Sequence, residues 1–194
     1  MGIRGLLWFT KTQPNAYYDV DIRQLGAAKR REGKEPVILV DVQNCGNFLY
    51  GDLDWMCGGQ YKEYLEKLQQ FVDSFQNAGI RVIMIIDGTC QDNKRPVWIK
   101  RRYEQLQKSV YPVFDYLRNQ KRGQLSEKIN PVLPHLNTKF ALTHILGVEI
   151  TTSQQETDYE IAKAAKDHDA IGILANDSDY LIYQTGVPLL SVND

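Results

Sequence analysis

The sequence is poor in cysteine and has no long hydrophobic run. Cys45, Cys57 and Cys90 form no CxxC pair and are odd in number, which argues against a disulfide framework or a zinc knuckle. The apolar run at 82–86 is far too short to cross a bilayer, and the N-terminus lacks the apolar core of a signal peptide. We therefore expect an intracellular protein, cytoplasmic or nuclear, with no membrane partner.

The chain also lacks repeats, low-complexity tracts and an excess of charge of either sign. Its formal net charge of −1 argues against a uniformly basic coat for nucleic acid, but leaves local patches open. With 194 residues, 43% hydrophobic and 24% charged, it has the size and composition of one α/β domain. We predict a single domain over residues 1–194.

Short segments rich in valine and isoleucine predict buried strands. Residues 37–41 (VILVD), 81–87 (RVIMIID) and 170–177 (AIGILAND) are apolar on both faces, and each contains an aspartate at its end. GVEIT at 147–151 and VPLLSV at 187–192 predict shorter strands.

Helical spacing of apolar residues predicts helices at 61–79, closed by Gly79, at 96–119, in broken form at 130–147, and at 153–169. In the last of these, Ser153 and Glu156 fit a capping box. Charged residues at 29–36 and 119–128 predict surface loops. Strands alternating with helices predict an α/β fold, with a central, mostly parallel sheet covered by helices on both faces.

Acidic residues gather at the predicted carboxyl ends of the strands, where the functional crevice of a doubly wound sheet lies. The acids at these ends are Asp41, Asp87, Asp177 and Asp179. Glu156 and Asp158 stand in the first turn of the helix before the third strand, and could face the same crevice. Six acids would then converge.

Carboxylates packed together repel each other unless cations lie among them. Oxygen ligands without histidine or cysteine favour Mg²⁺ or Mn²⁺, and two such ions about 4 Å apart suit phosphodiester cleavage. The pattern therefore predicts a metal-dependent nuclease in which these acids are the metal-binding and catalytic residues.

Each acid also has an ordinary structural explanation. A single aspartate at a strand end is often a turn or helix-cap residue. Glu156 could be the capping partner of Ser153, and Asp158 suits the positive end of a helix. These explanations leave out the coincidence of strand-terminal aspartates with the paired motifs ExD and DxD.

A basic segment follows the second predicted strand. KRPVWIKRRYEQLQK, residues 94–108, holds six basic residues and one acid. Lys94, Lys100, Arg101 and Arg102 could hold a phosphate backbone beside the metals. The alternative is a solvated helix face.

The motifs MGIRGL, VDVQN, IIDG, ETDYE and NDSDYLIY, in that order, resemble the flap endonuclease and XPG superfamily, whose fold is PIN-like. Within it, WMCGGQYKEY, the basic segment, ETDYEIA and DSDYLIY are similar to the constitutive coactivator of PPAR-gamma family, and the chain also resembles the Asteroid proteins. The resemblance spans nearly the whole chain.

The resemblance implies a role for each matching residue. The superfamily's metal acids correspond to Asp41, Asp87, Glu156, Asp158, Asp177 and Asp179. Gly2 corresponds to a glycine that approaches the substrate phosphates, and Lys94 with Lys100 or Arg101 resembles the residues that steer the scissile phosphate.

The sequence departs from the superfamily pattern at two points. The aromatic residue that stacks on a base falls near Asn47, so that contact would be absent or moved to Phe48. A further aspartate and a helix-two-turn-helix would lie beyond Asp194. We therefore expect this chain to be the N-terminal part of a longer protein.

Two functions remain open on this basis. The first is a nuclease that depends on Mg²⁺ or Mn²⁺ and acts on DNA or RNA. The second is a catalytically silent module that binds RNA or acts as a scaffold or coregulator for protein partners, because the resemblance to the coactivator family implies such roles. Retention of all the acids favours the enzyme.

Overall fold

The computed structural model describes residues 3, 5–53, 60–119 and 134–191, without the side chains of residues 47 and 134–136. In this part of the chain, five parallel strands form one sheet in the order β3-β2-β1-β4-β5. The strands are β1 (Val37–Asp41), β2 (Arg81–Ile86), β3 (Glu149–Thr152), β4 (Gly172–Leu174) and β5 (Leu189–Leu190). The predicted parallel sheet is confirmed, and β5 is shorter than the strand predicted at 187–192.

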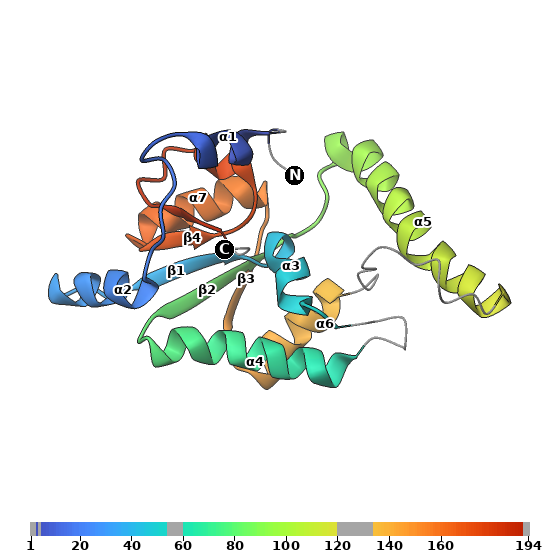
Figure 1. Cartoon of the computed structure of the whole chain (residues 1–194), viewed down its shortest axis with the longest axis horizontal. Coiled ribbons are helices and arrows are strands. Elements are labelled where there is room, and N and C mark those ends of the chain that lie inside the picture. Colours follow the sequence, from blue (N-terminus) through green and yellow to red (C-terminus); the bar gives the residue numbers. More distant parts are fainter. Residues whose placement is uncertain (1–2, 4, 54–59, 120–133, 192–194) are drawn as a thin grey trace.

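Helices cover both faces of the sheet (Figure 1). Helix α7 (Thr157–Asp167) lies on one face, and α3 (Val42–Tyr50) and α4 (Tyr61–Asn77) lie on the other. Helix α6 (Pro134–Phe140) runs beside α4, and α1 (Leu6–Thr12) lies near α7. The α/β fold class predicted from the sequence is therefore confirmed.

The alternation of side chains along β1 explains why both faces need helices. Ile38 and Val40 belong to the core on the α4 side, whereas Val37 and Leu39 belong to the core on the α7 side. Every residue of β1 is buried. A strand that is apolar on both faces is stable only where each face is covered, as in parallel sheets.

Gly79 ends α4 as predicted. Its φ is +66°, a conformation that glycine adopts without steric cost. The amide of Ile80 then donates to the carbonyl of Phe75 at 2.9 Å, which satisfies a carbonyl at the helix end. The chain is thereby turned directly into β2.

Part of one predicted loop is helical in the structure. The loop predicted at 29–36 is wrong at its start, because residues 29–31 are the last turn of α2 (Ile22–Arg31). Asp21 caps that helix by accepting the Arg23 amide at 2.9 Å, and Leu25 packs against the core. The segment 120–128, predicted as the second loop, lies outside the described residues.

The broken helix predicted at 130–147 is seen, in its described part, as α6 followed by a π-helical turn, η4 (Ala141–Ile145).

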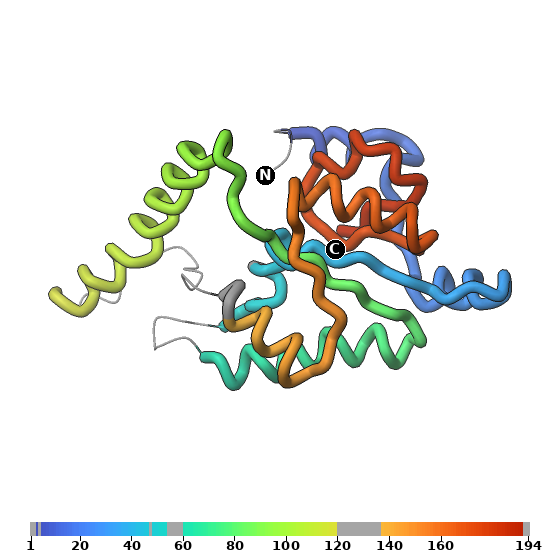
Figure 2. Tube along the Cα trace, turned by 180° about the vertical axis from the view of Figure 1, so that it is seen from behind, coloured from blue at the N-terminus to red at the C-terminus, as the bar shows by residue number. Residues whose placement is uncertain are grey.

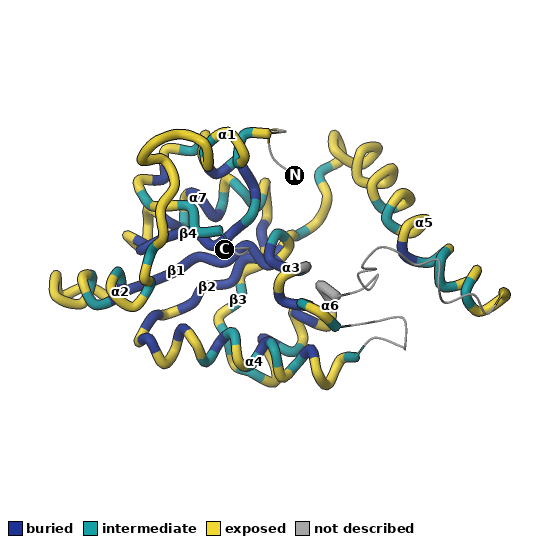
Figure 3. Tube along the Cα trace, in the orientation of Figure 1, coloured by how far each residue is buried: buried dark blue, intermediate teal, exposed yellow. Residues whose placement is uncertain are grey.

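Helix α5 (Arg95–Asn119) follows β2 through the short helix η2 (Asp92–Lys94) and projects away from the sheet (Figures 1 and 2). Its bounds match the helix predicted at 96–119 within one residue. Most of its length is exposed (Figure 3). No helix in the described part of the chain is both long and apolar enough to cross a membrane.

Candidate active site

Asp41 is the most deeply buried of the predicted site acids that the structure describes. It ends β1, and the residue is 1% exposed. Its carboxylate accepts the Asn44 amide at 2.9 Å, the Asn44 side chain at 2.7 Å and the Tyr180 hydroxyl at 2.8 Å. Burial raises the pKa of Asp41, and these hydrogen bonds partly offset the increase.

Asp158, Asp177 and Asp179 form an acidic cluster, because each offers a carboxylate oxygen within 4.8 Å of the other two. Asp177 precedes η5 (Ser178–Leu181), and its carboxylate accepts the Asp179 amide at 3.1 Å. This tight turn directs both side chains of the DxD motif toward the first turn of α7, which carries Asp158.

Electrostatics at Asp158 reflect this convergence. Burial, followed by the charges of Asp41 and Asp177, raises the pKa of Asp158 from 3.8 to about 6. Repulsion between neighbouring carboxylates has this sign, and a cation among them would remove it. The acidic cluster is therefore a place where positive charge is stabilised.

Tyr180 connects Asp41 to the acidic cluster. The residue is 3% exposed, and its hydroxyl donates to Asp41 at 2.8 Å and lies near the carboxylate of Asp158. Burial and then the two carboxylates raise the pKa of Tyr180, so the hydroxyl keeps its proton. Sequence reasoning missed this residue, although its position directly after the DxD motif placed it beside the site.

Asp87 and Glu156 take more peripheral positions. Asp87 follows β2 directly and is exposed, and its charge acts on the nearby Asp41. Glu156 is the N-cap residue of α7 and forms an ion pair with Lys94 of η2. The structure thus brings Asp158, Asp177 and Asp179 together, links Asp41 through Tyr180, and leaves Asp87 and Glu156 at the edge.

The predicted capping box is wrong. The Ser153 hydroxyl accepts the Gly88 amide at 2.9 Å and is hydrogen-bonded to Thr157 at 2.8 Å, while Glu156 makes no side-chain cap. The carboxylate of Glu160 accepts the Gln154 amide instead, at 2.7 Å. Because Ser153 is held by the loop after β2, Glu156 is left free to meet Lys94.

Gly88 allows this close approach between the loop after β2 and the segment before α7. A Cβ atom at Gly88 would lie 1.8 Å from the carbonyl oxygen of Ser153, which no side chain could tolerate. Glycine at this position therefore lets the ends of β2 and β3 meet beside the acids.

The basic segment lies mainly on α5, away from the acidic cluster. Lys100 and Arg101 are exposed, and Arg102 lies over the Trp98 ring with its guanidinium carbon 5.4 Å from the ring centroid. Lys94 is the predicted basic residue that the structure places beside an acid of the site. The other predicted basic residues lie on α5.

The beginning of the chain lies beside the DxD turn. The Ser178 hydroxyl donates to the Ile3 carbonyl at 3.2 Å. Gly2, predicted to approach the phosphates, lies outside the described residues. The Asn47 side chain lies outside them as well, and Phe48 is 48% exposed with its ring edge-on to Phe71.

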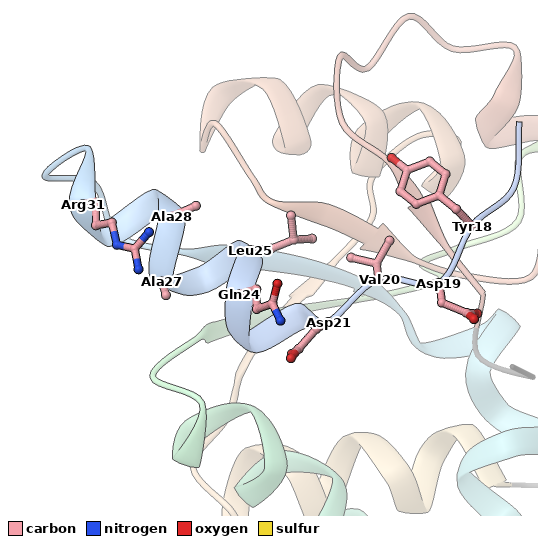
Figure 4. A pocket seen from close by; sticks show the side chains of 9 residues that line it. All are labelled: Tyr18, Asp19, Val20, Asp21, Gln24, Leu25, Ala27, Ala28 and Arg31. Atoms are coloured by element: carbon pink, nitrogen blue, oxygen red, sulfur yellow. The ribbon is translucent and has the colours of Figure 1, made fainter. Parts of the chain in front are cut away.

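A large open depression lies along α2 and does not involve these acids. Its volume is about 560 Å³, and its lining includes Tyr18, Asp21, Leu25 and Arg31 (Figure 4). None of the predicted site acids lines it, so this depression and the predicted chemistry lie apart.

Relatives of known name match the whole sequence, although no protein-family model does. The chain is 38% identical over 199 aligned positions to the constitutive coactivator of peroxisome proliferator-activated receptor gamma of Mus musculus, and covers 25% of that protein. It is 26% identical, over 73% of its length, to the single-strand DNA endonuclease ASTE1 of Danio rerio, and covers 19% of that protein. The chain is a homologue of the PPAR-gamma constitutive coactivators.

The fold of this coactivator homologue is that of a flap endonuclease core. The catalytic core of Rad2 in complex with a DNA substrate matches it with a TM-score of 0.56 at 17% identity, over 92% of this chain and 48% of the Rad2 chain. At that identity the likeness shows the fold alone. The chain spans about a quarter of the length of the coactivators that it matches.

The donor set of this coactivator homologue fits a hard divalent cation. The acidic cluster supplies carboxylate oxygens only, the ligands that Mg²⁺ and Mn²⁺ prefer. The raised pKa of Asp158 indicates negative charge that a cation would neutralise. Asp158, Asp177 and Asp179 are the residues that could hold such an ion directly.

Proposed function

We propose that the protein is a nuclease dependent on Mg²⁺ or Mn²⁺, which cleaves phosphodiester bonds in DNA or RNA at the carboxyl edge of the sheet. The convergence of Asp158, Asp177 and Asp179 within 4.8 Å carries the proposal. The flap endonuclease fold supports it, as does the likeness to a protein named a single-strand DNA endonuclease.

Each acid has a separate part in this proposal. Asp158, Asp177 and Asp179 would hold metal directly, and Asp41, oriented by Asn44 and Tyr180, would hold it through water. Asp87 and Glu156 would complete the coordination of a second ion at the edge of the site. Bound divalent ions lower the pKa of a water nucleophile and stabilise the leaving oxygen.

The basic residues would position the nucleic acid. Lys94 lies next to Glu156 and would meet the phosphate nearest the metals. Lys100, Arg101 and Arg102 would hold the backbone farther along α5, where contacts to phosphate give affinity without sequence preference. Gly2 would approach the phosphates from the start of the chain.

A cleavage assay with matched variants tests the proposal. Labelled flap, hairpin and single-stranded DNA and RNA would be incubated with the wild type, Asp179→Asn and the control Asp167→Asn, in Mn²⁺ or EDTA. Asp167 is an exposed acid at the far end of α7. A metal supplies several kcal/mol to such a reaction, so Asp179→Asn should slow cleavage by roughly a thousandfold.

One outcome of this assay would overturn the nuclease proposal. If the wild type and Asp179→Asn process every substrate alike, the cleavage does not depend on the acidic cluster. Loss of activity in Asp167→Asn as well would point to a general defect of the preparation.

A catalytically silent binding module is the second candidate, and a specific observation favours it. The Tyr180 hydroxyl donates to Asp41 beside Asp158, and Lys94 pairs with Glu156, so protein groups already hold part of the acidic site. The relatives named as coactivators also fit a scaffold with protein partners. Nucleic-acid binding that falls with salt but ignores EDTA and Mg²⁺ would support this module over the nuclease.

A further inference from the structure

A second depression lies at the edge of the acidic cluster, and of its lining residues the cleavage proposal uses only Glu156. Its volume is about 280 Å³, and we call it the tyrosine pocket. Its lining residues are Gln91, Gln155, Glu156, Tyr159 and Tyr183. They come from the loop after β2, from the start of α7 and from the segment after η5.

The tyrosine pocket adjoins the acidic cluster. Glu156 lines the pocket and caps α7, whose first turn carries Asp158. Burial, and then the nearby carboxylates of Asp158 and Asp179, raise the pKa of Tyr183, so its hydroxyl lies within the field of the cluster. A ligand in the pocket would therefore reach the proposed site of cleavage.

The lining combines flat aromatic surfaces with uncharged amides. Tyr159 is 50% exposed, and Tyr183 is partly buried, so both can offer ring surface to a ligand. The carboxamides of Gln91 and Gln155 can each donate and accept hydrogen bonds. A planar ring with a mixed donor and acceptor edge satisfies both features, which is the chemistry of a nucleobase.

Size and charge agree with a single base. The volume is just below the range of about 300–1,000 Å³ that small-molecule sites usually have, which suits one ring system. The carboxylate of Glu156 would repel a phosphate, but its pairing with Lys94 places a positive charge at the same rim. The base would thus enter the pocket while its phosphate stays near Lys94.

We propose that the tyrosine pocket is a subsite for one unpaired nucleobase, next to the phosphate held at the acidic cluster. The base must be unpaired, because in a duplex its faces are stacked and its pairing edge is occupied. This inference rests on the proposed action on nucleic acid. It predicts that the substrate is single-stranded where its base enters the tyrosine pocket.

Binding measurements with abasic oligonucleotides test the subsite without any cleavage. A fluorescent single strand would be titrated with protein in EDTA, and again in Ca²⁺, with one base removed at each position in turn. The variants are Tyr159→Ala, the conservative Tyr159→Phe and the control Tyr61→Ala. Tyr61 is 46% exposed and lies on α4, on the other face of the sheet.

Tyr159→Ala should weaken binding roughly tenfold, the effect expected from losing one stacked base. Tyr159→Phe should bind like the wild type, because the ring face remains. Removing the base at one position should weaken wild-type binding equally, and Tyr159→Ala should add little to that loss, because both changes remove the same contact.

The subsite is overturned if Tyr159→Ala and Tyr61→Ala bind alike, if no single abasic position matters, or if no oligonucleotide binds. These outcomes are separate from the fate of the nuclease. If Tyr159→Ala and removal of one base weaken binding equally, but no metal-dependent cleavage is found, the nuclease proposal fails and the subsite stands. If cleavage needs Asp179, but Tyr159→Ala changes neither cleavage nor affinity, the nuclease proposal stands and the subsite fails.

Discussion

The acidic edge of the sheet and helix α5 carry opposite charges and are held in opposite ways. Asp41 and Asp177 are 1% and 3% exposed, and their carboxylates accept hydrogen bonds from neighbouring groups. Along α5, Ser109 is the only buried residue of the described helix, and Trp98 and Phe114 are 47% and 62% exposed. The acids have a fixed geometry, whereas the helix is free to meet a partner.

The contrast indicates which part of the proposed nuclease site needs a precise geometry. Metal ligands act only within narrow limits of position, and rigid elements provide those limits. Phosphate contacts tolerate variation, because they are electrostatic and independent of sequence. The ion pair between Lys94 and Glu156 connects the two regions at the start of α5. Making the same substitution in both regions is therefore an informative experiment.

Leucine truncation should give the largest difference in stability loss between the sheet and α5. Leu39 is 0% exposed in the middle of β1, and Leu117 is 66% exposed on α5. Leu39→Ala should lower the free energy of unfolding by about 3 kcal/mol, from lost burial and the cavity left behind. Leu117→Ala should change it by less than about 0.5 kcal/mol. Urea unfolding measures both, and equal losses would show that α5 packs as firmly as the sheet.

The sheet and the acids at its edge could be predicted because their signals are local. Val37 to Asp41 are apolar at every position before the aspartate, which indicates a strand buried on both faces. Parallel strands carry their carboxyl ends to one edge, so acids at those ends are brought close. The order of the strands does not follow from this alternation, because β4 pairs with β1 and not with β3, the strand before it in the sequence.

The partners of these acids could not be predicted, because they depend on contacts between distant segments. Nothing near Tyr180 in the sequence says that its hydroxyl meets Asp41, 139 residues earlier. The Lys94 to Glu156 pair and the Ser153 to Gly88 hydrogen bond likewise join separate loops.

Helix α2 was missed for a local reason. The basic residues Lys29, Arg30 and Arg31 resemble a charged loop, yet cations are favourable at a helix C-terminus. Arg30 also donates to the carbonyls of Ala78 and Gly79, at 3.1 and 2.9 Å, so its charge serves the packing of α2 near the end of α4.

Removal of one tyrosine hydroxyl should give an intermediate difference in stability loss between the acidic edge of the sheet and α5. Tyr180→Phe takes a hydrogen bond from the buried Asp41 carboxylate and should cost about 2 kcal/mol, because that acceptor cannot turn to water. Tyr111→Phe, on an α5 side chain that is 58% exposed, should stay within about 0.5 kcal/mol. Both are measured by urea unfolding in EDTA. Identical stabilities for the two variants would mean that Tyr180 does not hold the acids together.

Neutralising one carboxylate should give the smallest difference in stability between the acidic edge and α5. This difference should depend on pH. The raised pKa of Asp158, about 6 against an ordinary 3.8, means that the stability this group allows below pH 3.8 is lost as pH rises through 6. Asp158→Asn should therefore gain about 1 kcal/mol over the wild type at pH 8, after allowance for solvent screening of a half-buried group, and nothing at pH 3.5. Asp115→Asn on α5 should stay within about 0.5 kcal/mol at both pH values. Urea unfolding in EDTA at the two pH values measures these differences. A gain from Asp158→Asn that is equal at both would show that carboxylate repulsion is not its cause.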